Sequence, residues 1–315
     1  MTIQLTASLK LAVSYQIYIK FLLYLKKTEN QQFMTTFQQR ALTAVIFGVV
    51  MLAGLFWNVI SFEILFTVIA LGCLWEFTLL TLGTAARFRE RIILYTAGTL
   101  FYFSLTIINH YFKYTIGFCS TLSIISVVFL MAKLFFQPEK PLTKPIIYFL
   151  SFFYIVFPFF QIQGLADNLY NFPGFNPILI FIMLLMTWAN DTFAYIIGSK
   201  IGKTLLYPKI SPKKTWEGTI GGALCCGLAA ALLSKFLIGK DSHALGWFEY
   251  LMVGFIIGVF GTIGDLIESM FKRNAGVKDS GSFMPGHGGF LDRFDAFIFV
   301  IPMVFFYIII LRWWV

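Results

Sequence analysis

Residues 176–198 read NPILIFIMLLMTWANDTFAYIIG, an apolar run that contains the amide of Asn190 and the carboxyl group of Asp191. A helix that spans a membrane needs about 20 predominantly apolar residues to cross roughly 30 Å of hydrocarbon. An ionised side chain inside such a helix is costly unless it has a partner. The run therefore predicts a membrane helix in which Asp191 is a candidate functional residue; the alternative is membership of a buried polar network.

The rest of the chain has the same character. Of its 315 residues, 58% are hydrophobic, 19% are aromatic and only 12% are charged, whereas soluble proteins have roughly 25% charged residues. This composition excludes both a water-soluble fold and a disordered chain. Apolar runs of sufficient length occur at residues 42–60, 62–82, 92–110, 114–136, 145–163, 176–198, 218–238, 248–269 and 294–312. We therefore predict an all-α polytopic membrane protein with about nine transmembrane helices.

The basic residues predict the orientation. If the segment before the first span is cytoplasmic, all but four of the 24 Lys and Arg residues fall on the cytoplasmic side. The four outside are Lys113, Lys235, Lys240 and Arg312. Because basic residues accumulate in cytoplasmic loops, this bias predicts a cytoplasmic N-terminus and an outside C-terminus. The net charge of +9 then indicates membrane lipid, and no nucleic acid, as a partner.

Three regions are expected along the chain. Residues 1–33 form an N-terminal extension that is interfacial or outside the fold, because its apolar part is short and is interrupted by Lys20. Residues 34–170 form the N-terminal transmembrane helices and contain few polar groups; Glu63 and Glu76 could each be functional or could pair helices. Residues 171–315 form a C-terminal transmembrane region with most of the candidate site residues.

The loop after the sixth span offers a phosphate-binding pattern. It reads Ser-Pro-Lys-Lys-Thr-Trp-Glu-Gly from Ser211 to Gly218, and its ammonium and hydroxyl groups suit phosphate oxygens. The candidates are Ser211, Lys213, Lys214 and Glu217. The alternative is that the two lysines only set the topology or contact anionic lipid.

The end of the eighth span carries a polar stripe. Asp265, Glu268, Ser269 and Lys272 follow one another at i, i+3, i+4 and i+7, which is one face of a helix. Lipid would not tolerate this face, so we expect it to face protein or a water-filled cavity.

The loop that follows and the start of the last span add further candidates. Glycines beside His287 let the backbone approach a ligand closely, and Asp292 and Asp295 at i and i+3 can point to one side, toward a metal or a helix N-terminus. With only three histidines in the chain, a zinc or iron site is disfavoured, whereas carboxylates beside Lys and Arg suit a hard cation that carries phosphates. This indicates magnesium-dependent phosphoryl or nucleotidyl transfer at the cytoplasmic face.

These residues form a recognisable pattern. The run Ser269-x2-Lys272-Arg273-x4-Lys278-Asp279, continued by His287-Gly288-Gly289-x2-Asp292-Arg293-Phe294-Asp295, resembles the defining motif of the phosphatidate cytidylyltransferases, or CDP-diacylglycerol synthases. The resemblance covers about the last 130 residues in detail. It departs from the family at Met284, where Leu, Ile or Phe is usual, and in the extension before Met34.

The resemblance implies a reaction in which CTP and phosphatidate give CDP-diacylglycerol and pyrophosphate, with Mg²⁺ as cofactor, as two divalent ions or a mixed metal pair. It also implies a homodimer in the bacterial cytoplasmic (inner) membrane, with its active site on the cytoplasmic side. The implied catalytic residues are Asp265 and Asp292, which would hold the metal, with Lys272, Arg273 and Lys278. The implied substrate-binding residues are Asp191, Ser211, Lys213, Lys214, Glu217, Asp279, His287, Gly288, Gly289, Arg293 and Asp295.

Two other functions share part of this pattern. A CTP-dependent lipid kinase or a related CDP-lipid synthase would also have clustered acids, and its nucleotide product would distinguish it. An ion-coupled transporter would also place acids in its spans. It would, however, need them near the midplane with polar groups on both faces, whereas here the polar residues gather on one side.

Overall fold

The structure is a computed structural model that describes residues 36–83, 88–111, 113–166, 175–237, 245–281, 283 and 288–314. The chain divides into two units after Phe47, and the site described below lies entirely in the second, Gly48–Val315. The expected extension, residues 1–33, lies outside the described residues, and so does the expected boundary between residues 170 and 171.

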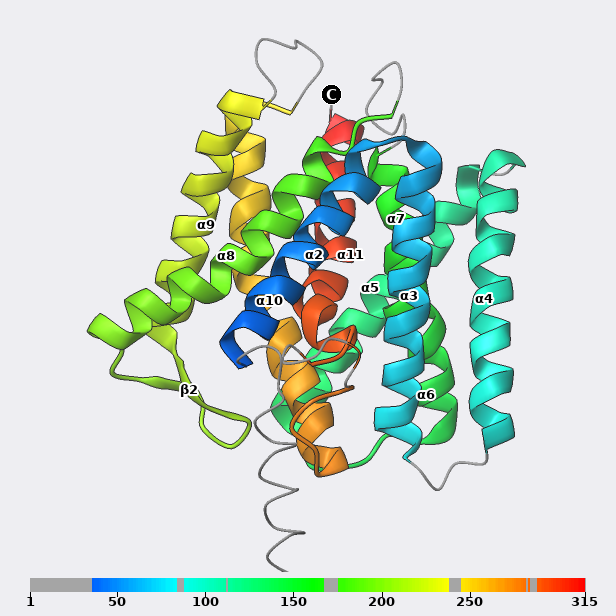
Figure 1. Cartoon of the computed structure of the whole chain (residues 1–315), viewed down its shortest axis with the longest axis horizontal. Coiled ribbons are helices and arrows are strands. Elements are labelled where there is room, and N and C mark those ends of the chain that lie inside the picture. The colour runs from blue at the N-terminus through cyan, green and yellow to red at the C-terminus, as the bar shows by residue number, and fades with distance from the viewer. Residues whose placement is uncertain are drawn as a thin grey trace, which may run out of the picture. The chain divides into compact units, whose positions relative to one another are not determined.

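Helices form nearly all of the described chain (Figure 1). A six-residue π-helical segment, η1, joins α6 to α7, so that these three run on from one another along the chain. The helices are α2 (Thr36–Phe56), α3 (Val59–Leu82), α4 (Phe88–Tyr111), α5 (Lys113–Phe136), α6 (Lys144–Leu150), η1 (Ser151–Val156), α7 (Phe157–Ala166), α8 (Ile178–Ile201), α9 (Trp216–Leu237), α10 (Trp247–Ala275) and α11 (Leu291–Trp314).

These helices coincide with the predicted spans, and the all-α polytopic membrane fold is confirmed. Within the described residues, seven segments are long and apolar enough to cross a membrane. They are Val59–Leu82, Cys119–Phe136, Lys144–Ala166, Ile178–Ile201, Trp216–Leu237, Trp247–Ala275 and Leu291–Leu311. The apolar part of α2 is shorter, Ala41–Phe56, and α4 begins with the charged run Arg89, Glu90 and Arg91. The count of nine crossings and the sides of the two termini stay predictions.

A small β-hairpin departs from the all-helical expectation. Strands β1 (Leu205–Tyr207) and β2 (Ser211–Thr215) pair antiparallel between α8 and α9, and in Figure 1 β2 lies beyond the ends of both helices. Both oxygens of Glu217 accept from the Thr204 amide, at 3.1 and 3.2 Å, which ties the start of the hairpin to its end. The hairpin therefore holds Ser211, Lys213 and Lys214 close to α8 and α9.

Glycines bring α8, α9 and α10 into close contact. A Cβ at Gly218 of α9 would lie 2.7 Å from the carbonyl oxygen of Ala194 on α8, and a Cβ at Gly258 of α10 would collide with the backbone of Ala223 on α9. Gly218 and Gly222 of α9, and Gly254 and Gly258 of α10, form two GxxxG pairs, and both are close-packing surfaces. Because Ala194 lies one turn after Asp191, this packing brings Asp191 of α8, β2 and Asp265 of α10 together.

The last helix, α11, packs against α3, α7 and α10. Its core side chains Phe294, Phe297 and Phe299 are fully buried. It approaches α10 closely at Gly264, where a Cβ would lie 2.8 Å from Phe299 Cβ and 2.9 Å from the carbonyl oxygen of Asp295. The absence of a side chain at Gly264 therefore places Asp295 of α11 beside Asp265 of α10.

Candidate active site

Three carboxylates meet where α10 crosses α11. One oxygen from each of Asp265, Glu268 and Asp295 lies within 4.8 Å of the others. Glu268 is 2% exposed and Asp295 is 8% exposed, whereas the side chain of Asp265 is 28% exposed. Three carboxylates this close repel one another strongly unless cations neutralise them.

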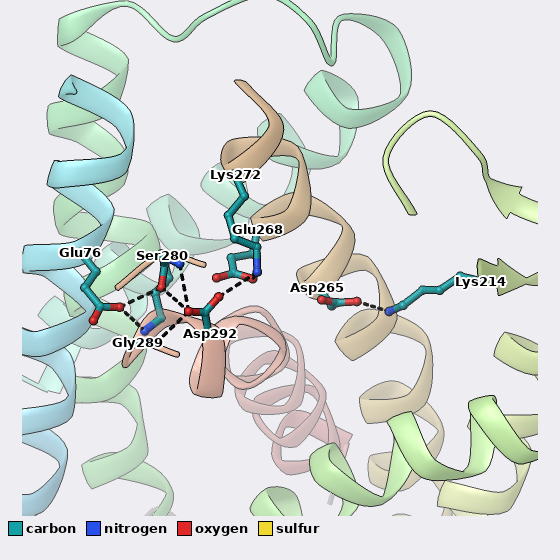
Figure 2. Close-up of polar contacts among 9 residues, drawn as sticks. Glu76, Lys214, Asp265, Glu268, Lys272, Ser280, Gly289 and Asp292 are labelled. Carbon is teal, nitrogen blue, oxygen red and sulfur yellow. Dashed lines mark hydrogen bonds and ion pairs between the residues drawn. The ribbon is translucent and has the colours of Figure 1, made fainter. Parts of the chain in front are cut away.

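Two lysines from different elements contact this cluster (Figure 2). Lys214 of β2 contacts Asp265, and Lys272 of α10 contacts Glu268 while its ammonium nitrogen lies 2.8 Å from Asp292 Oδ1. Burial lowers the pKa of Lys214, but the carboxylates of Asp265 and Asp191 outweigh that effect, so the pKa is raised. Lys214 therefore carries a full positive charge at neutral pH.

Asp292 is held by several donors at the start of α11. Its Oδ2 accepts from the amides of Ser280 at 2.9 Å and Gly289 at 2.8 Å, and it lies 3.0 Å from Ser280 Oγ. Gly288 has a φ of +83°, and a Cβ there would lie 2.7 Å from Asp292 Oδ2. Gly288 and Gly289 thus let the loop approach Asp292 closely. Both oxygens of this carboxylate already have hydrogen-bond or ion-pair partners within the protein.

A pocket opens beside Asp265. It has a volume of about 410 Å³ and is lined by parts of α8, β2, α9 and α10. Its polar lining includes Lys213 and Lys214 from β2 and two hydroxyl groups, Ser199 and Thr219, at the ends of α8 and α9. The remaining lining residues are Asp191, Ala194, Tyr195, Gly198, Ser211, Thr215, Gly218, Thr262 and Asp265. Two ammonium groups and several hydroxyls in a cavity of this size suit a phosphate-bearing ligand.

The structure brings together most of the described residues predicted for the site. Around the pocket it places Asp191, Ser211, Lys213, Lys214 and Asp265; around the start of α11 it places Lys272, Gly288, Gly289, Asp292 and Asp295. Arg293 is half-buried in the first turn of α11.

Other predicted residues lie apart from the buried cluster. Arg273, Lys278 and Asp279 are exposed after the polar stripe of α10. Glu217 is absent from the pocket lining and instead holds the hairpin through Thr204. His287 lies outside the described residues, so its predicted role stays a prediction.

Three residues in or near the site were absent from the predicted site: Glu268, Ser280 and Glu76. Glu268 was visible only as a member of the polar stripe on α10, and Ser280 gave no signal beyond its place in the loop. Glu76, on α3, accepts from Ser280 Oγ and from the amides of Phe290 and Leu291. Because Glu76 lies more than 200 residues before its partners, only an intramembrane acid in an otherwise apolar span could have indicated it.

The cluster fits a hard divalent cation. Glu268 Oε1 is buried and has no hydrogen-bond partner within the described part of the chain, although a buried carboxylate oxygen normally has one. The neighbouring potential metal ligands are carboxylate oxygens of Asp265 and Asp295, which are the ligand type that Mg²⁺ prefers. The residues present therefore suit magnesium better than a metal that requires imidazole or thiolate.

Comparison with known proteins identifies the family of the chain. The chain belongs to the Cytidylyltransferase family, which it matches over residues 38–311. Phosphatidate cytidylyltransferases from Staphylococcus epidermidis strain RP62A, Staphylococcus haemolyticus strain JCSC1435 and Staphylococcus aureus strain COL are 49%, 50% and 48% identical to it over 125 residues. The aligned segment spans 40% of this chain and 46% of each relative. The family resemblance seen in the motif is thus confirmed.

Proposed function

We propose that the protein is a CTP:phosphatidate cytidylyltransferase, which makes CDP-diacylglycerol and pyrophosphate in phospholipid biosynthesis. The observation that carries this proposal is the pocket with Lys213 and Lys214 directly beside the carboxylate cluster of Asp265, Glu268 and Asp295. The names of the relatives support the choice of substrates. The proposed location is the bacterial cytoplasmic (inner) membrane with the site on the cytoplasmic side, and a homodimer is proposed from the family resemblance.

The proposed reaction needs no covalent intermediate on the protein. An oxygen of the phosphatidate phosphate forms a bond to the α-phosphorus of CTP, while the bond from that phosphorus to the oxygen bridging to the β-phosphorus breaks. Pyrophosphate leaves with that oxygen and its electron pair. The protein therefore has to align two anionic substrates and neutralise the charge that develops on their oxygens.

The basic residues and hydroxyls would bind the phosphates. Lys213, Lys214 and Ser211 line the pocket, Lys272 of α10 contacts Asp292, and Arg293 lies in the first turn of α11. Asp191, Asp279, Glu217, His287, Gly288 and Gly289 are retained as proposed substrate-binding or loop-forming residues, and Arg273 and Lys278 as exposed cations that meet an incoming substrate.

The proposed cofactor is Mg²⁺, as two divalent ions or a mixed pair. Asp265, Glu268 and Asp295 are the residues that would hold it, with Asp292 as a further ligand if Lys272 leaves that carboxylate. When bound, such an ion neutralises phosphate oxygens and polarises the phosphorus that is attacked. The sequence alone assigned the metal to Asp265 and Asp292, and the contacts around Asp292 favour the set with Glu268 and Asp295.

The deciding experiment follows both products. Detergent-purified protein would be incubated with CTP, phosphatidate and Mg²⁺, with and without EDTA, and the lipid product and the released phosphate species would be identified. We expect CDP-diacylglycerol and pyrophosphate in equal amounts, both abolished by EDTA and restored by excess Mg²⁺. Formation of CDP without pyrophosphate, when a lipid alcohol is supplied, would instead indicate a CTP-dependent lipid kinase. An ion-coupled transporter would form neither product.

A further inference from the structure

The carboxylate of Glu76 lies at the N-terminus of α11, although it belongs to α3. Its Oε1 accepts from the amide of Phe290 at 3.0 Å, and its Oε2 accepts from the amide of Leu291 at 2.9 Å. Glu76 is 7% exposed, so these bonds are shielded from water. Figure 2 shows Glu76 reaching from its own helix toward the loop that precedes α11.

A helix start needs such acceptors. The first amides of a helix have no partner within it, and a negative charge there is favoured by the helix dipole. Ser, Thr, Asp or Asn usually supplies the acceptor from the position before the helix, but here Gly289 and Phe290 have no side-chain acceptor. Glu76 fulfils that function from a different helix.

Ser280 links the same carboxylate to Asp292. Its hydroxyl oxygen lies 2.9 Å from Glu76 Oε2 and 3.0 Å from Asp292 Oδ2. A hydroxyl has one proton and can donate to one acceptor at a time. The two carboxylates therefore share the hydroxyl of Ser280 as a hydrogen-bond donor. Glu76 therefore contacts α11, the helix that bears Asp292, and it is linked to Asp292 itself through Ser280.

Two glycines of the loop before α11 leave space for the carboxylate of Glu76. A Cβ at Gly281 or at Gly289 would collide with the oxygens of Glu76. Both glycines thus leave room for the side chain of Glu76 between the two ends of the loop. Such tight packing means that a displaced Glu76 would also displace Gly289, whose amide donates to Asp292.

We propose that Glu76 is a positioning residue for nucleotidyl transfer, an inference that rests on the proposed function. By fixing the N-terminus of α11, Glu76 sets where Asp292 and Asp295 lie relative to Asp265 and Glu268 of α10. It acts through these residues, because its hydrogen-bond partners are the hydroxyl of Ser280 and the amides of Phe290 and Leu291. Its substitution should therefore alter metal use and turnover more than it alters CTP binding.

The test is Glu76→Gln, with Glu90→Gln as the matched control. Gln keeps the shape but turns one acceptor into an NH₂ donor, which would face the amides or the hydroxyl of Ser280. Glu90 is also a helical carboxylate, in the first turn of α4, but it forms a partly exposed ion pair with Lys144 at 2.9 Å outside the site. The measurements are kcat, KM for CTP, the Mg²⁺ concentration for half-maximal rate, Mn²⁺ binding by electron paramagnetic resonance, and thermal unfolding.

We expect Glu76→Gln to lower kcat on the order of tenfold or more, because small misplacements of reacting groups cost this much. Mn²⁺ affinity should fall and the Mg²⁺ requirement should rise, while KM for CTP changes less than kcat. Glu90→Gln should match the wild type. A Glu76→Gln protein with a lower unfolding temperature but wild-type kcat and Mn²⁺ affinity would overturn the proposal, since Glu76 would then only stabilise the fold.

Ser280→Ala provides a second variant in case Glu76→Gln does not fold. It removes the linking hydroxyl and leaves the bonds from the Phe290 and Leu291 amides to Glu76 in place, so a smaller loss of kcat and of Mn²⁺ affinity is expected. In the double variant, the two losses of kcat should combine to less than their product because they act through one unit. Fully multiplicative losses, or a Ser280→Ala protein with wild-type values, would overturn the proposal.

Failure of the proposed function would look different. If the wild type forms no CDP-diacylglycerol, the reaction is wrongly assigned, while the comparison of Mn²⁺ affinity between wild type, Glu76→Gln and Glu90→Gln still decides whether Glu76 positions the carboxylates.

Discussion

Asp265 is the residue that belongs to both halves of the site, because it lines the pocket and is a member of the carboxylate cluster. Asp265→Asn should reduce turnover on the order of 100-fold or more, since it removes a metal ligand and leaves Lys214 without its counter-charge. The variant should still insert in the membrane. Steady-state product formation tests this, with Glu249→Gln, in the first turn of the same helix, as control. Undiminished activity would remove Asp265 from the site.

Asp292 and Asp295 can be separated by their metal dependence. Asp292 already has donors on both oxygens, whereas Asp295 lies with Asp265 and Glu268. We therefore expect Asp295→Asn to raise the Mg²⁺ concentration for half-maximal rate more than Asp292→Asn does. Titration of activity with Mg²⁺ for the two variants is the measurement. The reverse order would restore Asp292 as the principal metal ligand.

For single residues, the sequence predicted which side chains belong to the site better than it predicted their hydrogen-bond partners. Asp191, Lys214 and Asp265 were identified from their residue types in membrane or loop positions, and the pocket brings them together. The role of Glu217 at the hairpin and that of Glu76 at α11 were missed, because each depends on which backbone amides the fold presents to a carboxylate. Spacing along the chain carries no information about such partners.

The crossing of α9 and α10 is the element on which the geometry of the pocket depends. Gly258→Val should destabilise the protein by at least about 1–3 kcal/mol, because its side chain would collide with the backbone of Ala223. Thermal unfolding in detergent measures the loss. Gly48→Ala, at a helical glycine with nothing within 4 Å of the added Cβ, should leave stability unchanged or slightly raised. A Gly258→Val protein as stable as the wild type would show that the two helices can separate at little cost.

Helices were predictable from the sequence and the hairpin was not. Twenty apolar residues in a row have essentially one structural solution in a bilayer, a helix that satisfies its own backbone. The segment 205–215 is short and mixes apolar residues with lysines, and β1 and β2 are three and five residues long. Their pairing depends on anchors outside the segment, such as the Tyr207 hydroxyl, which donates to the carbonyl of Leu134 at 3.0 Å.

For the whole molecule, the distribution of basic residues predicts which end faces the cytoplasm. In a background without the four native cysteines, Lys209→Cys in the hairpin and Lys235→Cys in the last turn of α9 report on the two ends. A membrane-impermeant maleimide should label Lys235→Cys in intact cells and Lys209→Cys only in inverted vesicles. The opposite pattern would reverse the orientation and place the pocket outside the cell.

The bond between Glu76 and α11 has a consequence for synthesis of the chain. The ribosome makes α3 more than 200 residues before Phe290 and Leu291, which at roughly 5–20 residues per second is a delay of about 10–40 s. During that interval the nascent chain has an acidic group in α3 whose final hydrogen-bond donors do not yet exist. The carboxylate of Glu76 can therefore form these hydrogen bonds only after the start of α11 has been made.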